Sequence, residues 1–376
     1  METSRLRTAS PTEVQVPLAQ GPVPLVSKMD GTHETQPAWP YELGHFVLWR
    51  KFAERLGRIT RVSRHTSGGK ERAVNIVIAG GTGFIGRALC EKLLQSGHRL
   101  TILTRRPATV QRLFGSQVKA VEWDAVSAGT WQRSLTEAQG VINLTGAGLA
   151  DARWTARRKR VLTESRLLPT RLLVEACARL SVKPQVFISA SGVGFYGPRG
   201  TEVLDESSER GRGFLSDLCV QWESAAFEAA SQGIRVVCMR TGMVLGRDGG
   251  ALPRLALPFR LFLGGPVMPG TQWVSWIHRD DLVGMIEWAL ATPAVRGPVN
   301  GVAPSPVTMA EFCRLLGLVL KRPSWLPVPE FVLNTALGEL GSVMTTGQRV
   351  VPAVAERHGY GFRFLDVQRA LQAIFH

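Results

Sequence analysis

The chain has 376 residues, and its formal charge of +15, from 45 Lys and Arg against 30 Asp and Glu, favours acidic partners without choosing among nucleotides, nucleic acid and anionic lipid. Its five cysteines are widely spaced and form no CxxC or Cys/His cluster, which argues against a disulfide framework or a zinc site and favours a reducing compartment. No apolar stretch is long enough to span a bilayer and the start of the chain lacks a signal-peptide core, so we expect a soluble protein.

Residues 1–72 are expected to form an N-terminal extension, because scattered Pro, Ser, Thr and Gln predict disorder up to about residue 40. Residues 46–62 are rich in arginine and predict a short basic amphipathic helix, with apolar side chains at helical spacing: Trp49, Phe52, Leu56 and Ile59. Such a helix docks on the main domain, makes a peripheral contact with a membrane or partner, or belongs to a targeting segment. Acidic residues near the start weaken the targeting interpretation, so we expect a cytoplasmic protein, with a mitochondrion or plastid as the alternative.

From Val74 onward, apolar runs alternate with amphipathic ones, which predicts an α/β fold: a Rossmann doubly wound parallel sheet with helices on both faces. Gly97 is placed to end the first helix. We expect this domain to occupy residues 73–306. Its strands are predicted at 73–79, 100–104, 118–123, 140–144, 185–189 and 234–240, and its helices at 84–96, 166–180 and 215–230.

Beyond residue 240 the chain is richer in Pro, Gly and Trp, which predicts loops that build a smaller C-terminal substrate lobe. Thr308 and Glu311 have the spacing of a capping box before an apolar helical pattern. We therefore expect a helical C-terminal domain over residues 307–376.

A glycine-rich loop follows the first predicted strand and opens the first predicted helix. Glycine is needed where a chain turns sharply, where backbone approaches a pyrophosphate and where a helix packs closely on a strand, and the phosphates then sit on free N–H groups of the helix. The first gap is one residue wider than in the GxGxxG fingerprint, and a glycine turn without a ligand is the alternative. The expected cofactor residues of this loop are Gly80, Thr82, Gly83, Phe84, Ile85 and Gly86.

The second predicted strand ends in Thr104 and Arg105, where NAD-selective domains carry a carboxylate for the ribose 2′-hydroxyl. A guanidinium suits a 2′-phosphate instead, so the sequence predicts NADP(H) as cofactor, unless Arg105 belongs to a solvated turn. Asp124, after the third strand, accepts a hydrogen bond from adenine or forms a structural turn. The fourth strand ends in small polar residues at the edge where ligands of such sheets collect: Asn143, Leu144, Thr145 and Gly146.

The chain resembles the extended short-chain dehydrogenases/reductases, and within them the atypical group called epimerase family proteins, from about Val74 to its end. The resemblance implies that Arg166 reaches the pyrophosphate or ribose of the cofactor and that Leu144, Thr145 and Val244 line it; a surface helix arginine is the alternative for Arg166. It also implies that the C-terminal segment matches the small domain of unknown function that ends this group. The matching pieces are GGTGFIG at 80–86, NLTGA at 143–147, RWT…SR at 153–166, SASGVGFYG at 189–197, LCVQWE at 218–223, RTGMVLG at 240–246 and WIHRDDL at 276–282, with PVPEFVLNTALGE at 327–339 and GQRVVP at 347–352 in the C-terminal domain.

Enzymes of this superfamily use a Tyr and a Lys four residues later, with a Ser that orients the substrate oxygen, but no Tyr-xxx-Lys occurs in this sequence. Leu215 and Cys219 fall at the two positions, judged from the downstream Glu223. Ser191 sits where the catalytic serine of the superfamily lies, and Tyr196 follows it, so both are candidate catalytic residues. Their alternatives are a strand-end serine that satisfies backbone groups and a packing tyrosine.

Two functions are compatible with these features. The first is an NADP(H)-dependent oxidoreductase or epimerase-like enzyme acting on an unknown small molecule with a non-standard active site. The second is a non-catalytic NADPH-binding scaffold, since related plastid proteins are implicated in organelle division. A specific nucleic-acid site is not expected, because the basic run at 157–160 is typical of a solvated helix face and no aromatic residues interleave it.

Overall fold

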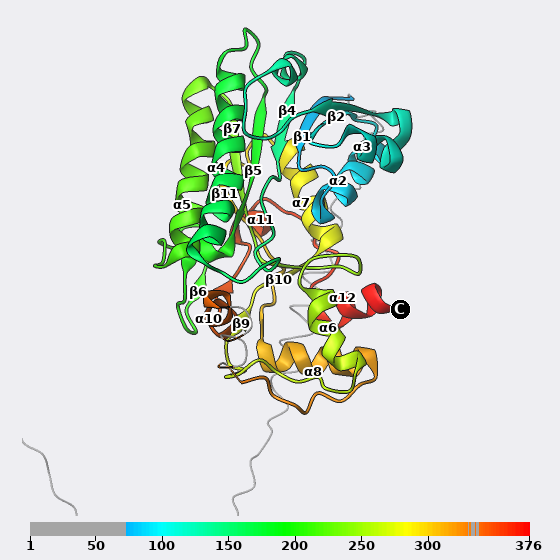
Figure 1. Ribbon diagram of the computed structural model, residues 1–376, viewed down its shortest axis with the longest axis vertical. Helices are drawn as coiled ribbons and strands as arrows, with labels where there is room; N and C mark the ends of the chain where they lie inside the picture. Colours follow the sequence, from blue (N-terminus) through cyan, green and yellow to red (C-terminus); the bar gives the residue numbers. More distant parts are fainter. Residues whose placement is uncertain (1–72, 330, 332–334, 336–337) are drawn as a thin grey trace, which may run out of the picture. The chain divides into compact units, whose positions relative to one another are not determined.

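A seven-stranded parallel sheet forms the centre of the computed structural model, which describes residues 73–329, 331, 335 and 338–376. The predicted extension at 1–72 lies outside the described residues. The strands run in the order β11-β7-β5-β4-β1-β2-β3, and the chain reverses its direction of winding between β1 and β4 (Figure 1). This confirms the predicted doubly wound sheet. The strands are β1 (Asn75–Ala79), β2 (Arg99–Thr104), β3 (Val118–Glu122), β4 (Gly140–Asn143), β5 (Val186–Gly192), β7 (Arg235–Thr241) and β11 (Gly297–Gly301).

Helices cover both faces of this sheet because each carries one apolar stripe that must be buried. The helices α2 (Phe84–Gln95), α3 (Pro107–Phe114) and α7 (Arg279–Ala291) contribute side chains to the core on one face. On the other face lie α4 (Ala156–Ala178) and α5 (Phe214–Phe227) (Figure 1). Short 3₁₀ turns complete this part: η1 (Gly115–Gln117), η2 (Thr130–Leu135), η3 (Val193–Tyr196) and η4 (Glu228–Gln232).

The helix predicted at 166–180 is wrong at its start, because α4 begins at Ala156. Thr155 caps it by accepting a hydrogen bond from the backbone N–H of Arg158, and Pro169 lies inside the helix. The first turns carry a run of basic residues and few apolar ones, so they lack the periodicity on which the prediction relied. The observed helix is therefore three turns longer at its N-terminal end, since one turn takes about 3.6 residues.

A smaller lobe follows the sheet and has its own core of apolar side chains. Thr308 caps α8 (Met309–Leu320) by accepting from the N–H of Glu311, but the Glu311 carboxylate pairs with Arg314, so the reciprocal half of the predicted capping box is missing. The lobe is held to α7 by Asp281, whose carboxylate accepts from the N–H groups of Arg363 and Phe364. Its helices are α6 (Leu252–Arg260), α8 (Met309–Leu320) and α12 (Val367–Phe375). Of the two further helices, α10 (Glu339–Thr345) packs against α4 and α5 through Leu340, and α11 (Ala353–Arg357) joins the core of the sheet through Ala355. The paired short strands are β8 (Met243–Leu245) with β10 (Trp276–His278), β9 (Trp273–Val274) with β12 (Val307–Thr308), and β6 (Val203–Leu204) with β13 (Arg349–Val350).

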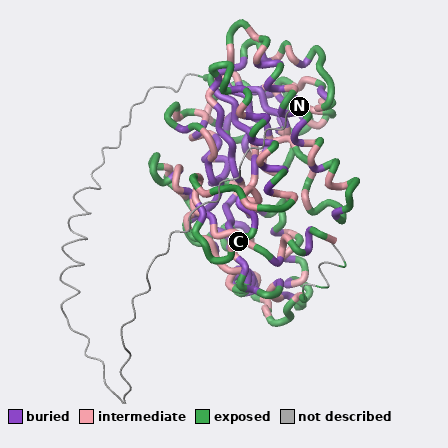
Figure 2. Tube along the Cα trace, turned by 90° about the vertical axis from the view of Figure 1, so that its left-hand side faces the viewer, coloured by how far each residue is buried: buried purple, intermediate pink, exposed green. Residues whose placement is uncertain are grey.

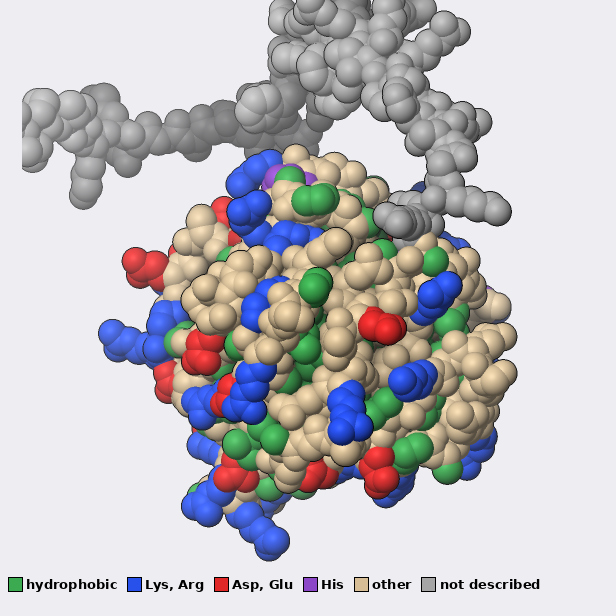
Figure 3. Space-filling view, turned by 90° about the horizontal axis from the view of Figure 1, so that it is seen from above, with side chains coloured by type: hydrophobic (Ala, Val, Ile, Leu, Met, Phe, Trp, Pro, Cys, Tyr) green, Lys and Arg blue, Asp and Glu red, His purple; other side chains and the backbone are tan. Residues whose placement is uncertain are grey.

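Buried residues gather along the sheet and in the lobe, while exposed ones occupy the loops around them (Figure 2). All five cysteines are buried free thiols. Across the residues that the structure describes, no helix has the length and apolarity that crossing a bilayer requires. Seen from above, Lys and Arg side chains are dispersed among Asp and Glu and do not merge into one basic patch on this face (Figure 3).

Candidate functional site

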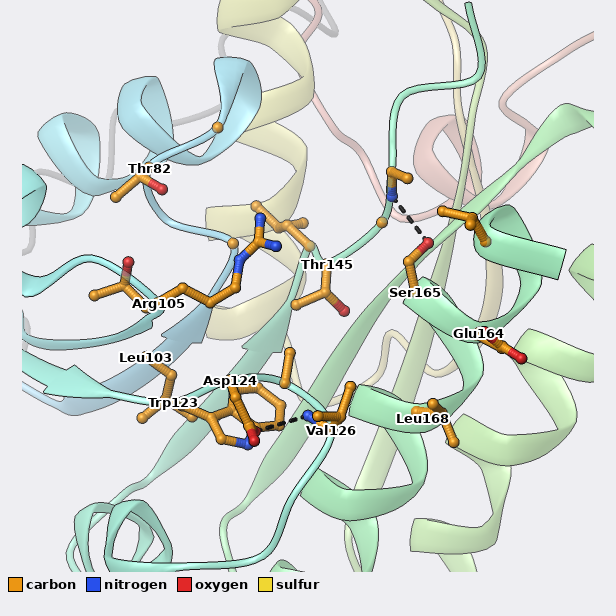
Figure 4. Close-up of a pocket in the computed structure, with 18 residues that line it drawn as sticks. Thr82, Leu103, Arg105, Trp123, Asp124, Val126, Thr145, Glu164, Ser165 and Leu168 are labelled. Carbon is orange, nitrogen blue, oxygen red and sulfur yellow. Dashed lines mark hydrogen bonds between the residues drawn. The ribbon is translucent and has the colours of Figure 1, made fainter. Parts of the chain in front are cut away.

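A cavity of about 490 Å³ lies at the carboxyl ends of β1, β2, β3 and β4, where the sheet changes direction. Ligands of open α/β sheets collect at this place because the loops that follow the strands diverge on either side of it. Figure 4 shows Thr82 and Arg105 on one side of the cavity, Thr145 near its middle and the helix α4 on the other side. The structure thus brings together nine predicted residues as its lining: Gly80, Thr82, Gly83, Thr104, Arg105, Asp124, Leu144, Thr145 and Gly146.

The glycine loop fits closely against its neighbours. Gly80 has a φ of +86°, and a Cβ atom there would lie 2.7 Å from the carbonyl of Leu144. A Cβ on Gly86 would lie 2.2 Å from the Gly80 carbonyl oxygen, so α2 approaches β1 at a distance that only glycine allows. The first turn of α2 has neither an acidic residue nor a side-chain cap, which leaves the N–H groups at this helix end available.

Phe84 and Ile85 do not line the cavity with their side chains. The Phe84 ring packs under the loop after β8, where a Cβ on Gly246 or Gly249 would come within 2.6 or 2.5 Å of it. Ile85 and Val244 pack against the core of the sheet. Contact of Phe84 and Ile85 with a cofactor would therefore be made by their backbone, in the first turn of α2.

Arg105 projects from the end of β2 toward the cavity and forms no ion pair among the described residues (Figure 4). The hydroxyl oxygen of Thr104 accepts from the N–H of Arg106 at 3.1 Å, which fixes the turn and leaves the hydroxyl hydrogen free to donate. No carboxylate occupies either position. An anion in this part of the cavity would therefore meet a guanidinium and a hydroxyl donor.

Asp124 performs the turn role that was its alternative. Its Oδ1 accepts from the N–H groups of Val126 and Ser127, both at 2.9 Å, and these bonds hold the pKa of this exposed carboxyl below its ordinary value. The side chain also lines the cavity beside Trp123, whose ring packs against Trp131 at 4.6 Å between centroids. Asp124 is thus a turn residue at the cavity wall.

Asn143 is fully buried and shapes the loop after β4 from behind. Its Oδ1 accepts from the backbone N–H of Thr145 at 3.1 Å and from the Thr145 hydroxyl at 2.6 Å, and its Nδ2 donates to Thr170. The side chain does not line the cavity; it positions Thr145, which does. The predicted residue is present, with an indirect role.

Arg166 lies directly behind the loop after β4. Its guanidinium donates to the carbonyl oxygens of Leu162 and Ala147 at 2.9 and 3.1 Å, and its Cζ would be 3.1 Å from a Cβ on Gly146. The side chain is 9% exposed and has no carboxylate partner among the described residues. Burial lowers the pKa of the guanidinium below its ordinary value, which records the cost of a buried charge without a counter-ion.

The prediction missed a row of cavity residues from α4, with further ones at the ends of β2, β3 and β4. Ser165 holds the loop from this helix, because its hydroxyl accepts from the N–H of Ala147 at 3.0 Å. The four α4 residues have the spacing of one helix face, a signal that was lost when the helix was predicted to begin at Arg166. The missed lining residues are Val161, Glu164, Ser165 and Leu168 of α4, with Leu103, Trp123, Ala125, Val126 and Ala147.

Ser191 lies at the end of β5, away from the cavity, in a buried polar network. Its hydroxyl donates to Glu223 at 2.6 Å, and the same carboxylate receives two hydrogen bonds of 2.8 Å from Arg240. A hydroxyl whose hydrogen is used in this way has only lone pairs left for a ligand. Ser191 therefore remains a candidate site residue, as a hydrogen-bond acceptor for a ligand.

Tyr196 lies in the core, where its hydroxyl has two partners. Its side chain is fully buried, its hydroxyl donates to Asn300 at 2.7 Å and it accepts from Arg240 at 3.0 Å. Desolvation raises the pKa of Tyr196 to about 12. Because both the hydroxyl and the ring are enclosed by core contacts, the geometry favours the packing role that the sequence left as the alternative to a proton donor.

Leu215 and Cys219 lie near Ser191, as their positions in the sequence predict. A Cβ on Gly194 would touch Leu215 at 3.0 Å, and the Cys219 thiol donates to the carbonyl of Gly192 at 3.5 Å. Burial raises the pKa of the Cys219 thiol to about 11. The Cys219 thiol is therefore protonated at neutral pH, and Leu215 carries no group that transfers a proton.

Comparisons with known proteins agree with this architecture. Residues 76–300 match the model of the NAD dependent epimerase/dehydratase family, and residues 328–374 match a domain of unknown function. An Arabidopsis thaliana protein, "Epimerase family protein SDR39U1 homolog, chloroplastic", is 39% identical over 310 residues, which are 81% of this chain and 88% of that protein.

Solved structures show the same similarity. The crystal structure of human epimerase family protein SDR39U1 with NADPH superposes with a TM-score of 0.72 at 35% identity, covering 80% of this chain and 98% of that one. A nucleoside-diphosphate sugar epimerase from Corynebacterium glutamicum has a TM-score of 0.66 at 32% identity, covering 87% of this chain and 62% of that one.

Proposed function

The chain belongs to the NAD dependent epimerase/dehydratase family, as its motifs predicted, and on this premise we propose that it binds NADP(H) in the cavity at the ends of β1 to β4 and acts as an oxidoreductase on a small molecule. The proposal rests on two arginines at this cavity that lack carboxylate partners in the described structure. Arg105 lines the cavity, and Arg166 lies behind the loop after β4. The phosphates of an anionic dinucleotide supply the negative charges that both arginines lack.

The selectivity for the 2′-phosphate rests on the end of β2. Arg105 points toward the cavity, and Thr104 has a hydroxyl hydrogen to donate. A carboxylate here would repel the phosphate, and none is present. The relative crystallised with NADPH is consistent with this choice of cofactor.

The pyrophosphate is proposed to lie between the start of α2 and Arg166. The helix end offers uncapped N–H groups and the positive end of its dipole. Arg166 lies behind Gly146 and outside the cavity lining, and we propose that an anion following the cavity wall comes within its reach. A buried guanidinium is weakly hydrated, so it binds phosphate strongly when one arrives.

When bound, NADPH supplies a hydride. The chain contributes positioning, and it lacks the Tyr/Lys pair for proton transfer. Ser191, held by Glu223 and Arg240, presents an oxygen that accepts a hydrogen bond, which fits a substrate hydroxyl or amino group. We propose that the substrate carries such a donor and that solvent provides any proton the reduction needs.

The test measures oxidation of NADPH by the full-length protein in the presence of each member of a panel of carbonyl compounds and nucleotide sugars. Stopped-flow absorbance of NADPH reports the oxidation. Turnover that falls in Ser191→Ala, with NADPH affinity unchanged, supports the proposal. Tight NADPH binding without oxidation across the panel would favour the non-catalytic scaffold. Absence of NADPH binding would remove both.

We also propose a reducing compartment, because all five cysteines are buried thiols. The Arabidopsis relative is described as chloroplastic, and this chain is proposed to reside in the cytoplasm or, if residues 1–72 direct it there, in an organelle. A fluorescent fusion with and without residues 1–72 distinguishes the two locations.

A further inference from the structure

The C-terminal lobe exposes a group of large apolar side chains on α6, on the loop after it and on the segment after α8. Phe262 is 55% exposed and Trp325 is 62% exposed. Such large apolar groups are normally buried, and when they gather on a surface they mark an interaction site. We call this group the apolar tip; its members are Leu257, Leu261, Phe262, Leu263, Trp325 and Leu326.

The two segments of the apolar tip are joined by hydrogen bonds. The Trp325 indole N–H donates to the carbonyl of Phe262 at 3.0 Å, and the backbone N–H groups of Trp325 and Leu326 donate to the carbonyl of Gly264 at 2.9 and 3.1 Å. Figure 1 shows α6 and α8 next to each other, away from β1 and β2 at the other end of the view. The tip is therefore one ordered surface that lies apart from the cofactor cavity.

The surroundings of the apolar tip are basic. Residues 252–270 and 317–329 contain Arg254, Arg260, Lys321 and Arg322 and not one Asp or Glu; Arg254 pairs with Asp151, and the other three have no carboxylate partner among the described residues. The Arg322 guanidinium stacks over the Phe262 ring at 4.4 Å from its centroid, and Arg260 and Lys321 are exposed. Apolar side chains next to uncompensated cations are typical of surfaces that enter the headgroup region of a membrane.

The positive charge around the apolar tip distinguishes between the partners that could bind there. A second copy of the chain pairing through the same surface would bring like charges together, which is unfavourable. Nucleic acid would meet the cations but would leave the exposed leucines and Phe262 without apolar partners. An anionic lipid surface satisfies both features, because its phosphates pair with the cations and its acyl boundary accepts the apolar side chains.

We propose that the apolar tip docks the protein on an anionic lipid surface, with Leu261, Phe262 and Trp325 entering the boundary between headgroups and acyl chains and Arg260 and Lys321 contacting lipid phosphates. The contact is peripheral. It is independent of the proposed cofactor chemistry, because the tip shares no residue with the cavity.

The test is sedimentation of the full-length protein with vesicles of phosphatidylcholine alone or with phosphatidylglycerol added. We expect binding to the mixed vesicles that weakens at high salt, as ions screen the cations. Arg260→Glu with Lys321→Glu should lower the affinity at least about tenfold, since each basic residue near such a surface contributes substantially. The matched control is Arg112→Glu with Lys119→Glu, two exposed cations at the sheet, which should leave binding unchanged.

A second variant tests the apolar part: Leu261→Ser with Phe262→Ser should abolish sedimentation, while Val182→Ser, at a 73% exposed site elsewhere, should not. Unchanged circular dichroism and thermal unfolding show that the variants are folded. Binding that survives both double variants would overturn the proposal and assign the lipid contact to another part of the chain. Absence of binding to anionic vesicles, or a dimer in sedimentation velocity that Leu261→Ser with Phe262→Ser dissolves, would overturn it as well.

Discussion

The guanidinium of Arg166 is buried beside the proposed cofactor cavity with backbone carbonyls as its hydrogen-bond acceptors. A charge in this position lowers the stability of the free protein unless an anion joins it. The sequence predicted both Arg105 and Arg166 as cofactor-binding residues, but the structure gives them different surroundings. Arg105 is exposed and recognises what enters the cavity, whereas Arg166 is fixed in the wall.

Arg166→Met removes the buried charge and keeps the volume. We expect the free energy of unfolding without cofactor to change by less than about 1 kcal/mol, because relief of the buried unpaired charge offsets the loss of the hydrogen bonds to Leu162 and Ala147. The dissociation constant for NADPH should rise at least about tenfold, because a charge-assisted contact is lost. Isothermal titration and urea unfolding measure the two quantities. Arg171→Met, on the exposed side of the same helix, is the control, and equal NADPH affinity in both variants would contradict the assignment.

Arg105→Ala tests cofactor selectivity. The dissociation constant for NADPH should rise about 10- to 100-fold, while that for NADH stays the same, since the lost contact is made only to the 2′-phosphate. Fluorescence titration of the reduced cofactors measures both. The neighbouring exposed Arg106, which is absent from the cavity lining, supplies the control Arg106→Ala. A parallel loss for NADH would show that Arg105 does not read the phosphate.

At the scale of elements, the contact between β1 and α2 is the part of the fold that the cofactor site depends on most. The helix starts where it does because Gly83 has an extended backbone at the N-cap and Gly86 lets the first turn approach the strand. The glycine pattern in the sequence predicts this contact, since a Cβ at Gly86 has no space. By contrast, the sequence did not reveal the face of α4 that lines the cavity. Its residues are a mixture of polar and apolar types, because they line a cavity and are not part of the core.

Gly86→Ala should destabilise the protein by about 2 kcal/mol or more, because the added methyl would lie 2.2 Å from the Gly80 oxygen and must push the helix away from the strand. NADPH binding should fall with it, as the N–H groups at the helix end move. Thermal unfolding and cofactor titration follow the two effects. Gly361→Ala, where no atom lies within 4 Å of the added Cβ, is the matched control. An unaltered melting temperature in Gly86→Ala would mean that the approach of α2 to β1 is looser than described.

At the scale of the whole described unit, the lobe and the sheet are connected through the start of α7. His278 caps this helix by accepting from the N–H of Asp280 at 3.1 Å, and its ring packs on Phe364 with centroids 4.0 Å apart. Asp281 holds the same C-terminal segment through its carboxylate. Burial lowers the pKa of His278 to about 4, so the neutral ring is the form that belongs to the folded protein.

This pKa gives a pH dependence with a defined sign. Between the unfolded pKa of about 6.5 and the folded value of about 4, the unfolded chain binds the proton and the folded protein does not, so stability falls as the pH is lowered. The loss amounts to at most roughly 3 kcal/mol and is complete near pH 4. His278→Asn, which retains a capping acceptor, should reduce the drop in urea midpoint between pH 7 and pH 4.5. The exposed His358→Asn should not, and an equal drop in both variants would contradict the role of His278.

The sequence by itself determined the parallel sheet, the glycine loop, the cationic end of β2 and the absence of the Tyr/Lys pair. These are local features, set by strand and helix periodicity and by glycine at positions where a side chain has no room. Only the tertiary structure shows which groups Ser191 and Tyr196 contact, because their partners Glu223 and Asn300 lie 32 and 104 residues away along the chain. Burial and hydrogen-bond pairing at such separations arise when the chain packs, and no local pattern records them.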